Sequence, residues 1–334
     1  MTPLSIIIVN YKTPGLVLDC LRTVFDQTDL EALEVIVVDN DSRDDSRALV
    51  LSRFPKVKWI DMGYNSGFAR ANNEGIRQST GEIVLLLNSD TLIEDFAIKG
   101  CWRELKASPF VAAGVQLMNA DRTPQISGNY FMKGGLNYLL PLPYLGGWVK
   151  KAGRLFRVSA PNVPEASALA EVDWINGAFL MVKRSALELA GLMDEDFFLY
   201  AEEAEWCGRL RRIGRLAIFG QYHVVHLQGV SANETFGSRG HGYYNLFDRK
   251  GLQIMLSNFV RIRKQFGVAW FLVQLGIYWL EVPVFAAGLL VSGLSGRRSR
   301  YSWGMFRHYC IHLGFVTGKF GTILRNKPYF YKVL

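Results

Sequence analysis

The stretch Ile83-Val84-Leu85-Leu86-Leu87-Asn88-Ser89-Asp90 decides the fold class of this chain. Its first five residues are apolar, which predicts a strand buried on both faces of a mostly parallel sheet. Three polar residues follow at once, and ligands bind at the carboxyl ends of strands in open α/β sheets. The carboxylate of Asp90 would there hold a divalent cation against a substrate phosphate. The alternative is that Asn88, Ser89 and Asp90 only form a turn and cap the next helix.

Two further strand patterns also end in polar residues. The β-branched and aliphatic runs at 4–9 and 34–38 lead into Asn10-Tyr11 and Asp39-Asn40. Helical patterns separate the strands, and this alternation predicts a doubly wound α/β sheet with short loops at its carboxyl edge. Polar strand exits at one edge make a polar pocket there. No GxGxxG follows the first strand and the chain has no GxxxxGK[ST], which disfavours dinucleotide and P-loop sites.

Composition places the chain among globular proteins with anionic partners. Of its 334 residues, 49% are hydrophobic and 20% charged, and the mean hydropathy of +0.10 is high for a freely soluble protein. The net charge of +8 favours nucleotides, phosphates or anionic lipid as partners. The four cysteines are far apart, which indicates a reducing compartment rather than a zinc site. No signal-peptide pattern opens the chain, so we expect the N-terminal domain in the cytosol.

Four segments, in this order, resemble successive motifs of family 2 glycosyltransferases, which are inverting enzymes of the GT-A fold. They are residues 5–11, residues 37–42, residues 65–69 with Asn73 and Gly75, and Asn88-Ser89-Asp90. The likeness is greatest to the rhamnosyltransferase-like branch that builds bacterial cell-surface polysaccharides. It extends to about residue 230.

The resemblance implies a nucleoside-diphosphate sugar as donor, linked to dTDP or UDP. Asn10 and Asp39 match residues that hold its base and ribose, and Asn88-Ser89-Asp90 matches the metal-binding tripeptide of the DxD type. Because Asn and Ser precede a single acid here, Asp90 is the expected ligand of Mn²⁺ or Mg²⁺, and Ser89 is expected at the ribose or a water. The implied donor-binding residues are Val9, Asn10, Tyr11, Asp39, Asn65, Gly67, Phe68, Asn73, Asn88, Ser89 and Asp90.

Two later segments resemble the acceptor half of the family. Trp174 and Gly177 match a segment whose Trp and Gly form the floor of the acceptor side, although a lone Trp is more often ordinary core. Asp194 and Glu195 begin a run that matches the family pattern Asp-Glu-x-Phe-Phe. These four residues are the expected acceptor-binding residues.

Residues 200–213 predict a helix that ends before Gly214. Its apolar face consists of Trp206, Cys207, Leu210 and Ile213, and Glu203 falls near the middle of that face. An inward carboxylate is costly unless it is paired or functional. A partly buried carboxylate is what a general base for a sugar hydroxyl requires. The alternative is a salt bridge between Glu203 and a nearby arginine.

The family has Glu-Asp where this chain has Glu202-Glu203, and its second acid usually serves as the base. The resemblance therefore implies Glu203 as the catalytic base, with Glu202 as the alternative. His226 opens a segment, residues 226–231, that resembles the family's His-x-x-Gly-x-Ser. There the histidine approaches the metal or the diphosphate, so His226 is the second expected metal ligand. A purely structural histidine is the alternative.

We expect a GT-A domain over residues 1–235 and a helical, basic and apolar region over 236–334. Within the first, 1–118 would bind the nucleotide sugar and 171–235 the acceptor. Residues 119–170 appear as an irregular, Pro- and Gly-rich stretch, expected to be a binding loop or lid. The alternative is a surface insertion. Its aromatic residues favour contact with an acceptor or a membrane; they are Tyr130, Phe131, Tyr138, Tyr144 and Trp148.

The C-terminal region has the composition of a membrane-associating segment. Residues 243–266 are amphipathic and basic, and 268–293 are nearly all apolar. A charged residue, Glu281, and then Pro283 favour two shorter interfacial or re-entrant helices over one span. Arginines interleaved with aromatic residues over 297–309 are typical of a membrane interface. The alternative is a buried helical subdomain or a dimer contact.

The predicted function is therefore metal-dependent, inverting transfer of a sugar such as rhamnose. The acceptor would be a hydroxyl of a polyprenyl-diphosphate-linked or other glycan in cell-surface polysaccharide synthesis. The protein would lie at the cytoplasmic face of the plasma membrane, as a peripheral or monotopic protein. No nucleic acid partner is expected, and oligomerisation stays open. A nucleotidyltransferase and a binding-only homologue are the rival interpretations. Retention of Asp39, Asp90, Glu203 and His226 together disfavours the binding-only one.

Overall fold

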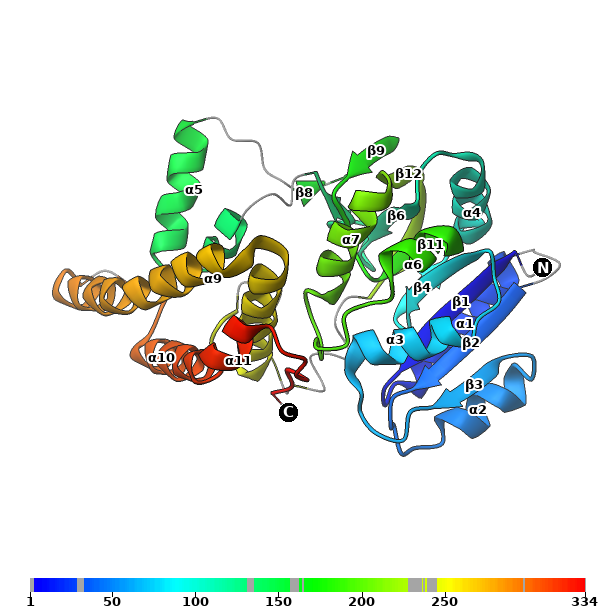
Figure 1. Cartoon of the computed structure of the whole chain (residues 1–334), viewed down its shortest axis with the longest axis horizontal. Coiled ribbons are helices and arrows are strands. Elements are labelled where there is room, and N and C mark those ends of the chain that lie inside the picture. The colour runs from blue at the N-terminus through cyan, green and yellow to red at the C-terminus, as the bar shows by residue number, and fades with distance from the viewer. Residues whose placement is uncertain are drawn as a thin grey trace. The chain divides into compact units, whose positions relative to one another are not determined.

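The structure is a computed structural model that divides the chain into two compact units (Figure 1). It describes residues 3–28, 33–130, 135–156, 162–163, 165–227, 236, 238, 245–296 and 298–333. The first unit comprises Met1–Met132, Pro161–Phe198 and Glu202–Ser231. The second comprises Lys133–Ala160, Leu199–Ala201 and Ala232–Leu334. The stretch 119–170, which the sequence groups as one loop, is thus divided between the two units.

The first unit contains the strands and most of the shorter helices. Its strands are β1 (Leu4–Asn10), β2 (Leu33–Asp39), β3 (Lys58–Asp61), β4 (Ile83–Asn88), β5 (Thr91–Ile93), β6 (Ala112–Met118), β7 (Gly128–Asn129), β8 (Asn162–Val163), β9 (Leu169–Val172), β10 (Trp174–Ile175), β11 (Phe179–Lys183) and β12 (Leu216–His226). Its helices are α1 (Pro14–Gln27), α2 (Ser46–Arg53), α3 (Gly67–Arg77), α4 (Ala97–Ala107), α6 (Arg184–Ala190) and α7 (Glu202–Ile213).

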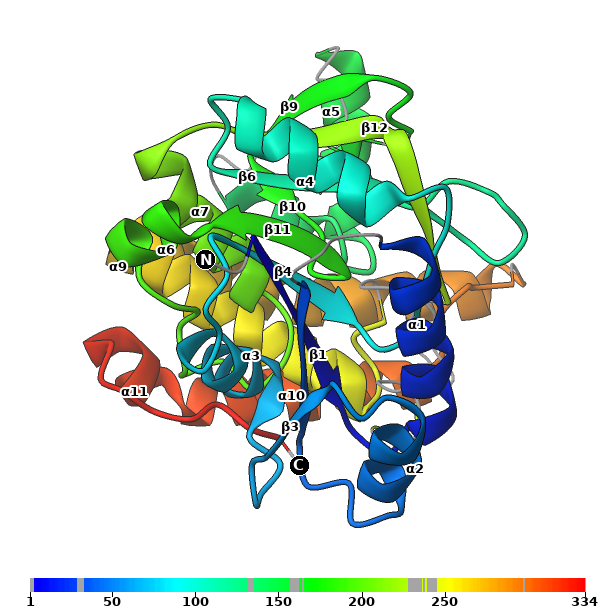
Figure 2. The same ribbon diagram turned by 90° about the vertical axis from the view of Figure 1, so that its right-hand side faces the viewer.

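The central sheet of the described chain has the order β3-β2-β1-β4-β11-β6-β12-β5, with β9 paired to β12 (Figure 2). The first four of these strands are parallel, and β11 runs antiparallel between β4 and β6. Asn10 pairs with Asp39, and Val9 pairs with Asn88. The polar exits of β1, β2 and β4 therefore meet at one edge. The predicted α/β fold with a mostly parallel sheet is confirmed.

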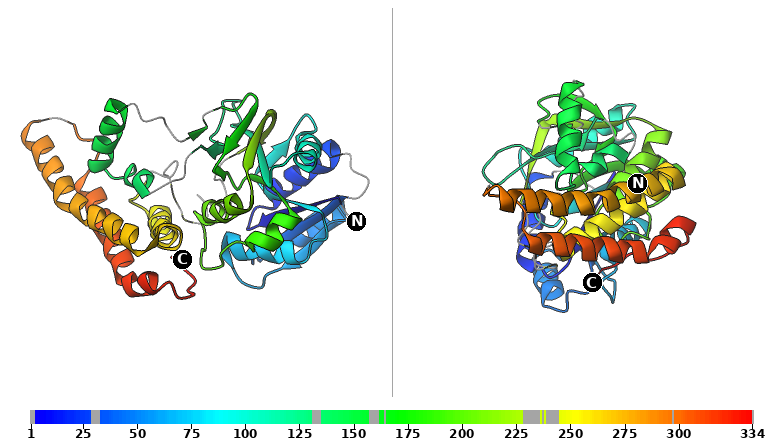
Figure 3. Two further views of the ribbon diagram at one scale, coloured as in Figure 1. Left: turned by 45° about the horizontal axis from the view of Figure 1, so that its top comes forward. Right: turned by 90° about the vertical axis from the view of Figure 1, so that its left-hand side faces the viewer.

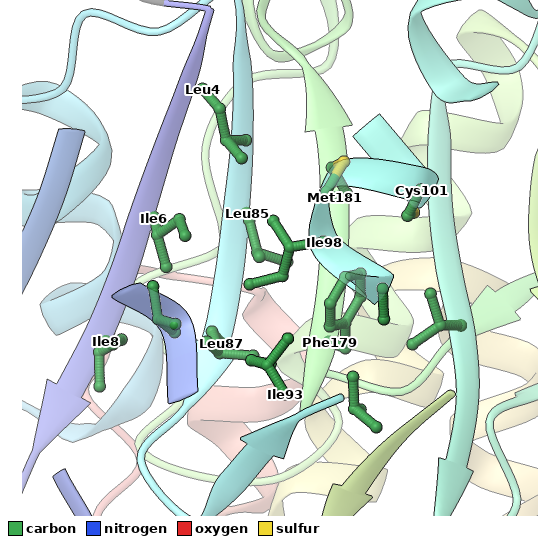
Figure 4. Packing of buried hydrophobic residues seen from close by; sticks show 14 of the residues in the cluster. Leu4, Ile6, Ile8, Leu85, Leu87, Ile93, Ile98, Cys101, Phe179 and Met181 are labelled. Atoms are coloured by element: carbon green, nitrogen blue, oxygen red, sulfur yellow. The ribbon is translucent and has the colours of Figure 1, made fainter. Parts of the chain in front are cut away.

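Both faces of the sheet are covered, because alternate residues of each strand point to opposite sides. Ile6 and Ile8 of β1 pack in one apolar cluster with residues of α1, α2 and α4. Ile7 packs in the other cluster, with residues of α3, α6 and α7. Figure 4 shows the first cluster, where Leu85 and Leu87 of β4 lie near Phe179 of β11. Two helix layers thus fix the strands, and with them the edge at which the strands end.

Two local features of the structure are not evident from the sequence patterns described above. The last strand, β12, extends from Leu216 to His226 and changes register between Phe219 and His223. The stretch predicted as irregular contains a helix, α5 (Leu145–Leu155). Gly146 and Gly147 resemble a turn signal, but Gly146 is buried where a Cβ would lie 2.6 Å from the Leu140 carbonyl oxygen. Close packing against the Leu140 backbone therefore requires a residue without a Cβ at position 146.

The second unit is helical. Besides α5 it contains a 3-10 turn, η1 (Gly135–Leu139), and the helices α9 (Arg249–Leu294), α10 (Trp303–Gly318) and α11 (Phe320–Arg325). Helices α9 and α10 lie side by side (Figure 3), and the Tyr309 hydroxyl donates to the Tyr278 carbonyl oxygen at 2.7 Å. Among the described residues, α9 is long and apolar enough to cross a membrane by length and composition.

The predicted division of the apolar stretch near Pro283 is wrong. Helix α9 continues through Pro283, and its one non-helical residue is Gly267, with φ at +89°. A Cβ at Gly267 would meet nothing within 4 Å, so the backbone angle rather than crowding favours glycine there. Glu281 is buried, and its carboxylate accepts the N–H groups of Tyr144 at 2.8 Å and Leu145 at 2.9 Å. This acid caps the first turn of α5 instead of interrupting α9.

Candidate active site

The paired ends of β1 and β2 carry a closed set of side-chain hydrogen bonds. The Asn10 amide donates to Asp39 Oδ1 at 2.7 Å and to Ser42 Oγ at 3.0 Å. The Ser42 backbone N–H donates to Asp39 Oδ2 at 3.0 Å. Because all three residues are buried, these bonds fix the direction of the Asp39 carboxylate. Each carboxylate oxygen can accept a further donor, so Asp39 can still bind an N–H or hydroxyl group.

Val9 and Tyr11 flank Asn10 at this edge. Val9 faces Asn88 in the parallel pairing of β1 with β4. Tyr11 follows the last residue of β1, and the Lys12 ammonium lies 5.3 Å from the centroid of its ring. The half-buried Tyr11 ring therefore stands beside both a cation and the polar strand ends.

Asn40 places the turn before α3, although the sequence did not single it out as a site residue. Its Oδ1 accepts the Ser66 N–H at 2.8 Å and the Ser66 hydroxyl at 2.7 Å. Its amide donates to Asn65 Oδ1 at 3.1 Å, which also accepts the Gly67 N–H at 3.2 Å. Asn65 and Gly67 are thereby held next to the end of β2.

Gly67 is required by both its backbone angle and its surroundings. Its φ is +76°, and a Cβ would lie 2.2 Å from the Phe198 carbonyl oxygen. That oxygen accepts the Phe68 N–H at 2.8 Å. The start of α3 is therefore joined to the segment that precedes α7.

Gly177 brings two predicted site residues together. A Cβ on Gly177 would lie 3.6 Å from Cβ and Cγ of Glu203 and 3.7 Å from Cε1 of Phe68. The Asn88 backbone N–H donates to the Ala178 carbonyl oxygen at 3.0 Å. The loop before β11 thus connects the end of β4 to the Glu203 side chain.

Helix α7 begins at Glu202, so both candidate bases lie in its first turn. Both are buried, and an N-terminal turn favours negative charge. The two residues before the helix, Tyr200 and Ala201, each adopt φ of +70°. Such non-glycine conformations cost about 1–3 kcal/mol each and cluster at functional sites.

Glu205, in the first turn of the same helix, is paired with an arginine. Arg209 Nε donates to Glu205 Oε1 at 2.9 Å and to Oε2 at 3.0 Å, and Arg209 Nη2 donates to Oε2 at 2.8 Å. Its charge is therefore compensated within the helix. Of the predicted apolar face, Trp206, Cys207 and Leu210 are buried, while Ile213 is 38% exposed at the end of the helix. Inclusion of Ile213 in the buried face was wrong, because Ile213 is the last residue of α7, where the burial of that face ends.

Asn73 and Glu195 contact each other. The Asn73 amide donates to the Met193 carbonyl oxygen at 2.9 Å and to Glu195 Oε1 at 3.0 Å, and its oxygen accepts the Met193 N–H at 3.0 Å. Burial would raise the pKa of Glu195, but hydrogen bonds from Arg77 and Asn73 and nearby arginine charges lower it overall. Asp194 Oδ1 accepts the Asp196 N–H at 3.0 Å. These contacts join the 193–196 segment to α3.

Trp174 lies in the apolar cluster that includes α7 residues. It pairs with Asn129 across β10 and β7. Its indole N–H is buried and has no hydrogen-bond partner among the residues that the structure describes. The side chain thus combines a core position with an available donor.

Asp90 and His226 meet at the end of β4. His226 Nε2 is 3.3 Å from Asp90 Oδ1 and 3.4 Å from the Asn88 amide nitrogen. The Leu227 N–H donates to the Asp90 carbonyl oxygen at 2.9 Å, and His226 pairs with Thr91 across β12 and β5. Ser89, Asp90 and His226 are all buried. Residues 228–231 of the predicted histidine motif lie outside the described residues.

The pair of Asp90 and His226 fits a divalent cation. A carboxylate oxygen and an imidazole nitrogen are ligands that Mn²⁺ accepts, and such sites leave further positions to substrate phosphate oxygens and water. Within the described ranges, no group of three or more His, Cys, Asp or Glu side chains converges on one point.

Comparison with known proteins agrees with this geometry. Residues 5–152 match the family model described as glycosyl transferase family 2. That match covers somewhat less than half of the 334 residues. The low-salt glycan biosynthesis hexosyltransferase Agl10 of Haloferax volcanii is 29% identical over 233 residues, which cover 66% of this chain and 66% of that protein. The chain thus spans less than two thirds of the length of this relative.

A second relative is similar in sequence, and a solved structure is similar in fold. The N-acetylglucosaminyl-diphospho-decaprenol L-rhamnosyltransferase of Mycobacterium tuberculosis is 25% identical over 248 residues, covering 68% of this chain and 78% of that protein. The mannosyltransferase PcManGT of Pyrobaculum calidifontis, solved with GDP-Man and Mn²⁺, superposes with a TM-score of 0.54 at 16% identity. That match covers 97% of this chain and 87% of the other. At this identity it establishes the GT-A fold alone.

Proposed function

We propose that this chain is an inverting, metal-dependent glycosyltransferase that moves a sugar from a nucleoside-diphosphate donor to a hydroxyl group. The single observation that supports the proposal most strongly is the contact between Asp90 Oδ1 and His226 Nε2, which lie 3.3 Å apart beside the end of β4. On the same sheet edge, Asn10 and Asp39 offer a fixed carboxylate. Through the loop at Gly177, a buried acid lies near this edge.

The donor would bind across the ends of β1, β2 and β4. Asp39 accepts hydrogen bonds only, which suits the ring N–H of uracil or thymine or a ribose hydroxyl. This chemistry supports a UDP- or dTDP-linked sugar, with rhamnose among the candidates. The other proposed contacts are Val9, Asn10, Tyr11, Asn65, Gly67, Phe68, Asn73, Asn88 and Ser89.

Asp90 and His226 would hold Mn²⁺ or Mg²⁺ at the diphosphate. When bound, such a cation offsets the negative charge of the departing nucleoside diphosphate. Asn88 lies within 3.4 Å of His226 and helps to keep the imidazole next to Asp90. Ser89 would contact the ribose or a bound water.

Glu203 would act as the general base. Its side chain lies beside Gly177, where the absence of a side chain leaves room for an acceptor hydroxyl. Glu203 would take the hydroxyl proton as the oxygen attacks the sugar carbon opposite the leaving diphosphate, which gives inversion. Glu202 is the second candidate, because it is also buried in the first turn of α7.

The acceptor would be a glycan carried by a polyprenyl diphosphate, in cell-surface polysaccharide synthesis. The name of the Mycobacterium tuberculosis relative states a decaprenol-linked substrate, which supports this class of acceptor. Trp174 and Gly177 would form the floor of the acceptor side. Asp194 and Glu195 would shape that side from the segment joined to α3.

The second unit would associate with the cytoplasmic face of a membrane as a peripheral or monotopic surface. Its helix α5 exposes Trp148 at 59% and Leu155 at 80%, and the C-cap residue Phe156 is 77% exposed. Lys150 and Lys151 are exposed on the same helix, and anionic lipid attracts such residues. Helix α9 adds exposed apolar residues, among them Leu280, Leu290, Val291 and Leu294.

Product analysis tests the proposed reaction. Full-length protein is incubated with Mn²⁺ and a panel of UDP- and dTDP-sugars, and released nucleoside diphosphate and pyrophosphate are quantified. We expect nucleoside diphosphate from one donor class only in the presence of metal. Release of pyrophosphate would favour a nucleotidyltransferase, and donor binding without any hydrolysis or transfer would favour a binding-only protein.

A binding measurement identifies the donor before an acceptor is known. A ligand that binds only the folded protein stabilises it by about 2.7 kcal/mol at 100 times its Kd. Thermal unfolding with each nucleotide sugar, with and without Mn²⁺, should therefore select one donor. Equal stabilisation by all donors, or independence from metal, would contradict the assignment of this edge.

A further inference from the structure

We propose that Gln125 is a positioning residue that fixes the His226 imidazole in one tautomer, with the proton on Nδ1. Gln125 Oε1 lies 2.9 Å from His226 Nδ1, and both side chains are buried. The inference deepens the proposed function, because it concerns the histidine that would hold the metal. It assigns a role to a residue of the 119–170 stretch that the sequence analysis did not select.

The orientation of the Gln125 amide follows from its other contacts. Its nitrogen is 2.6 Å from the His226 carbonyl oxygen, 2.8 Å from Asn119 Oδ1 and 3.3 Å from the Met118 carbonyl oxygen. Each of these atoms only accepts hydrogen bonds, whereas an amide oxygen in the same place would face them without a proton to share. The nitrogen must therefore occupy that side, and the amide oxygen must face the imidazole.

Asn119 is itself fixed in the direction that this argument requires. Its amide nitrogen donates to the Thr123 hydroxyl at 2.8 Å, which turns its oxygen toward Gln125. The backbone of Gln125 is held on both sides, because its N–H donates to the Leu117 carbonyl oxygen at 2.7 Å and its carbonyl oxygen accepts the Gln116 amide at 2.9 Å. The amide that faces His226 therefore has little freedom to rotate.

The tautomer follows from the direction of this hydrogen bond. An amide oxygen carries no proton, so His226 Nδ1 must be the donor. In a neutral imidazole the other nitrogen is then an acceptor, and Nε2 presents its lone pair. That nitrogen lies 3.3 Å from Asp90 Oδ1 and 3.4 Å from the Asn88 amide nitrogen. A lone pair directed beside a carboxylate oxygen is the arrangement that a divalent cation requires.

Two observations separate this role from ordinary loop packing. Gln125 contacts both the ring and the backbone carbonyl of the same histidine, so it sets the position as well as the tautomer. Gln116 anchors the same segment without contacting the ring: its amide donates to Leu117 and Gln125, and its oxygen accepts the Ala166 N–H at 2.7 Å. Loss of Gln116 would remove a comparable set of buried hydrogen bonds but no contact to the imidazole.

Nitrogen-15 NMR of full-length protein labelled at histidine tests the tautomer directly. Long-range proton–nitrogen correlations distinguish Nδ1–H from Nε2–H, and comparison with His226→Gln assigns the ring among the five histidines. We expect Nδ1–H for His226 in wild-type protein without metal. A proton on Nε2 with none on Nδ1 in wild type overturns the proposal, and this readout does not depend on the proposed enzymatic function.

Gln125→Met and Gln116→Met form the matched pair of variants. In Gln125→Met we expect a mixed or reversed His226 tautomer and 10- to 100-fold weaker Mn²⁺ binding in the presence of UDP, measured by electron paramagnetic resonance. In Gln116→Met we expect the wild-type tautomer and Mn²⁺ affinity within a few-fold of wild type. Equal loss of Mn²⁺ affinity in both variants with an unchanged tautomer overturns the proposal in favour of loop packing. If Gln125→Met does not fold, Asn119→Ala replaces it, because this variant removes one acceptor of the Gln125 amide nitrogen. The proposal is then judged on the His226 tautomer in wild type and in Asn119→Ala.

If wild-type protein binds no Mn²⁺ with UDP but shows Nδ1–H at His226, the proposed metal function fails and the positioning of the ring stands. If wild-type protein binds Mn²⁺ but His226 carries a proton on Nε2 and none on Nδ1, the metal function stands and the positioning role of Gln125 fails. The two proposals therefore fail separately.

Discussion

The edge of the sheet and the helical second unit both bury carboxylates, but they use them differently. At the edge, Asp90 lies beside an imidazole nitrogen, and within the described part of the chain neither side chain accepts a backbone N–H group. In the second unit, Glu281 accepts two backbone N–H groups of α5. The first arrangement leaves capacity for a ligand, whereas the second satisfies the protein itself. A buried acid indicates a functional site only when its partners leave such capacity.

Asp90→Asn gives the largest expected effect on the first side of this comparison. The amide keeps the shape but lowers the charge available to a cation, so metal-dependent donor binding and transfer should be lost. The midpoint of thermal unfolding should stay close to wild type, because the carboxylate supports a ligand rather than the core. Titration with Mn²⁺ and the selected donor measures the binding. Wild-type affinity in the variant would make Asp90 a turn residue.

Glu203→Gln tests whether the buried acid next to Gly177 is the base. Donor binding should persist and kcat should fall by about 10²- to 10⁴-fold, because the amide cannot take a proton. Glu205→Gln is the matched control on the same helix, since its wild-type charge is already held by Arg209. We expect that variant to lose stability and keep its turnover. Normal turnover in Glu203→Gln with an inactive Glu202→Gln would move the role to Glu202.

Much of the fold and of the site could be predicted from the sequence, because both depend on short-range patterns. The apolar run 83–87 predicts strand β4 from its own residues. The polar residues at 10, 39 and 88 mark the ends of their strands. The resemblance added Glu203 and His226, which the structure places beside Gly177 and Asp90, and their roles stay predictions. The exact members of the family's donor and acceptor contacts stay predictions.

The remainder depends on contacts between residues distant in the sequence. Gln125 acts on a histidine 101 positions later, and nothing in its own neighbourhood indicates that role. Ser42 and Asn40 hold the ends of β1 and β2 and the turn before α3 through side-chain hydrogen bonds that a strand pattern does not reveal. Helix α5 resembled a turn because its capping acid, Glu281, is 137 positions away from Tyr144. Glu281 was also one of the two residues from which a break in the apolar stretch was predicted, and helix α9 continues through it.

Glu281→Ala tests the other side of the comparison. It removes two charge-assisted hydrogen bonds from the start of α5, and each is worth roughly 1.5–3 kcal/mol. We expect a loss of about 3 kcal/mol in the stability of the second unit, with donor binding in the first unit retained. Urea unfolding followed through the fluorescence of Trp148 measures the change. Loss of donor binding without loss of stability would make Glu281 a functional acid after all.

Lys150→Gln combined with Lys151→Gln tests the exposed surface of α5. Each basic residue near an anionic membrane contributes about 1 kcal/mol, so the pair should weaken partitioning onto anionic vesicles roughly 30-fold. Lys56→Gln with Lys58→Gln is the matched control, since it makes the same charge change on exposed residues of the first unit. Vesicle sedimentation at low and high salt measures the difference. Equal effects of both pairs would mean that net charge, and not α5, decides binding.

Glu195→Gln gives the smallest expected effect. Glu195 is partly exposed and paired with an arginine, so it resembles neither Asp90 nor Glu281. The pKa of Glu195 is lowered below its ordinary value of 4.5 in the folded protein, since the contacts with Arg77 and Asn73 outweigh the effect of burial. A lowered pKa means that its ion pair stabilises the fold above the unfolded-state pKa and ceases to do so as the pH falls through the folded-state value. The carboxylate is 41% exposed, so solvent screening limits the contribution to about 0.2–1 kcal/mol. Urea unfolding of wild type and Glu195→Gln should therefore differ slightly at pH 7 and converge as the pH falls below 4.5. A difference that persists at pH 3 would mean that the Asn73 contact, which does not require charge, is what stabilises this segment.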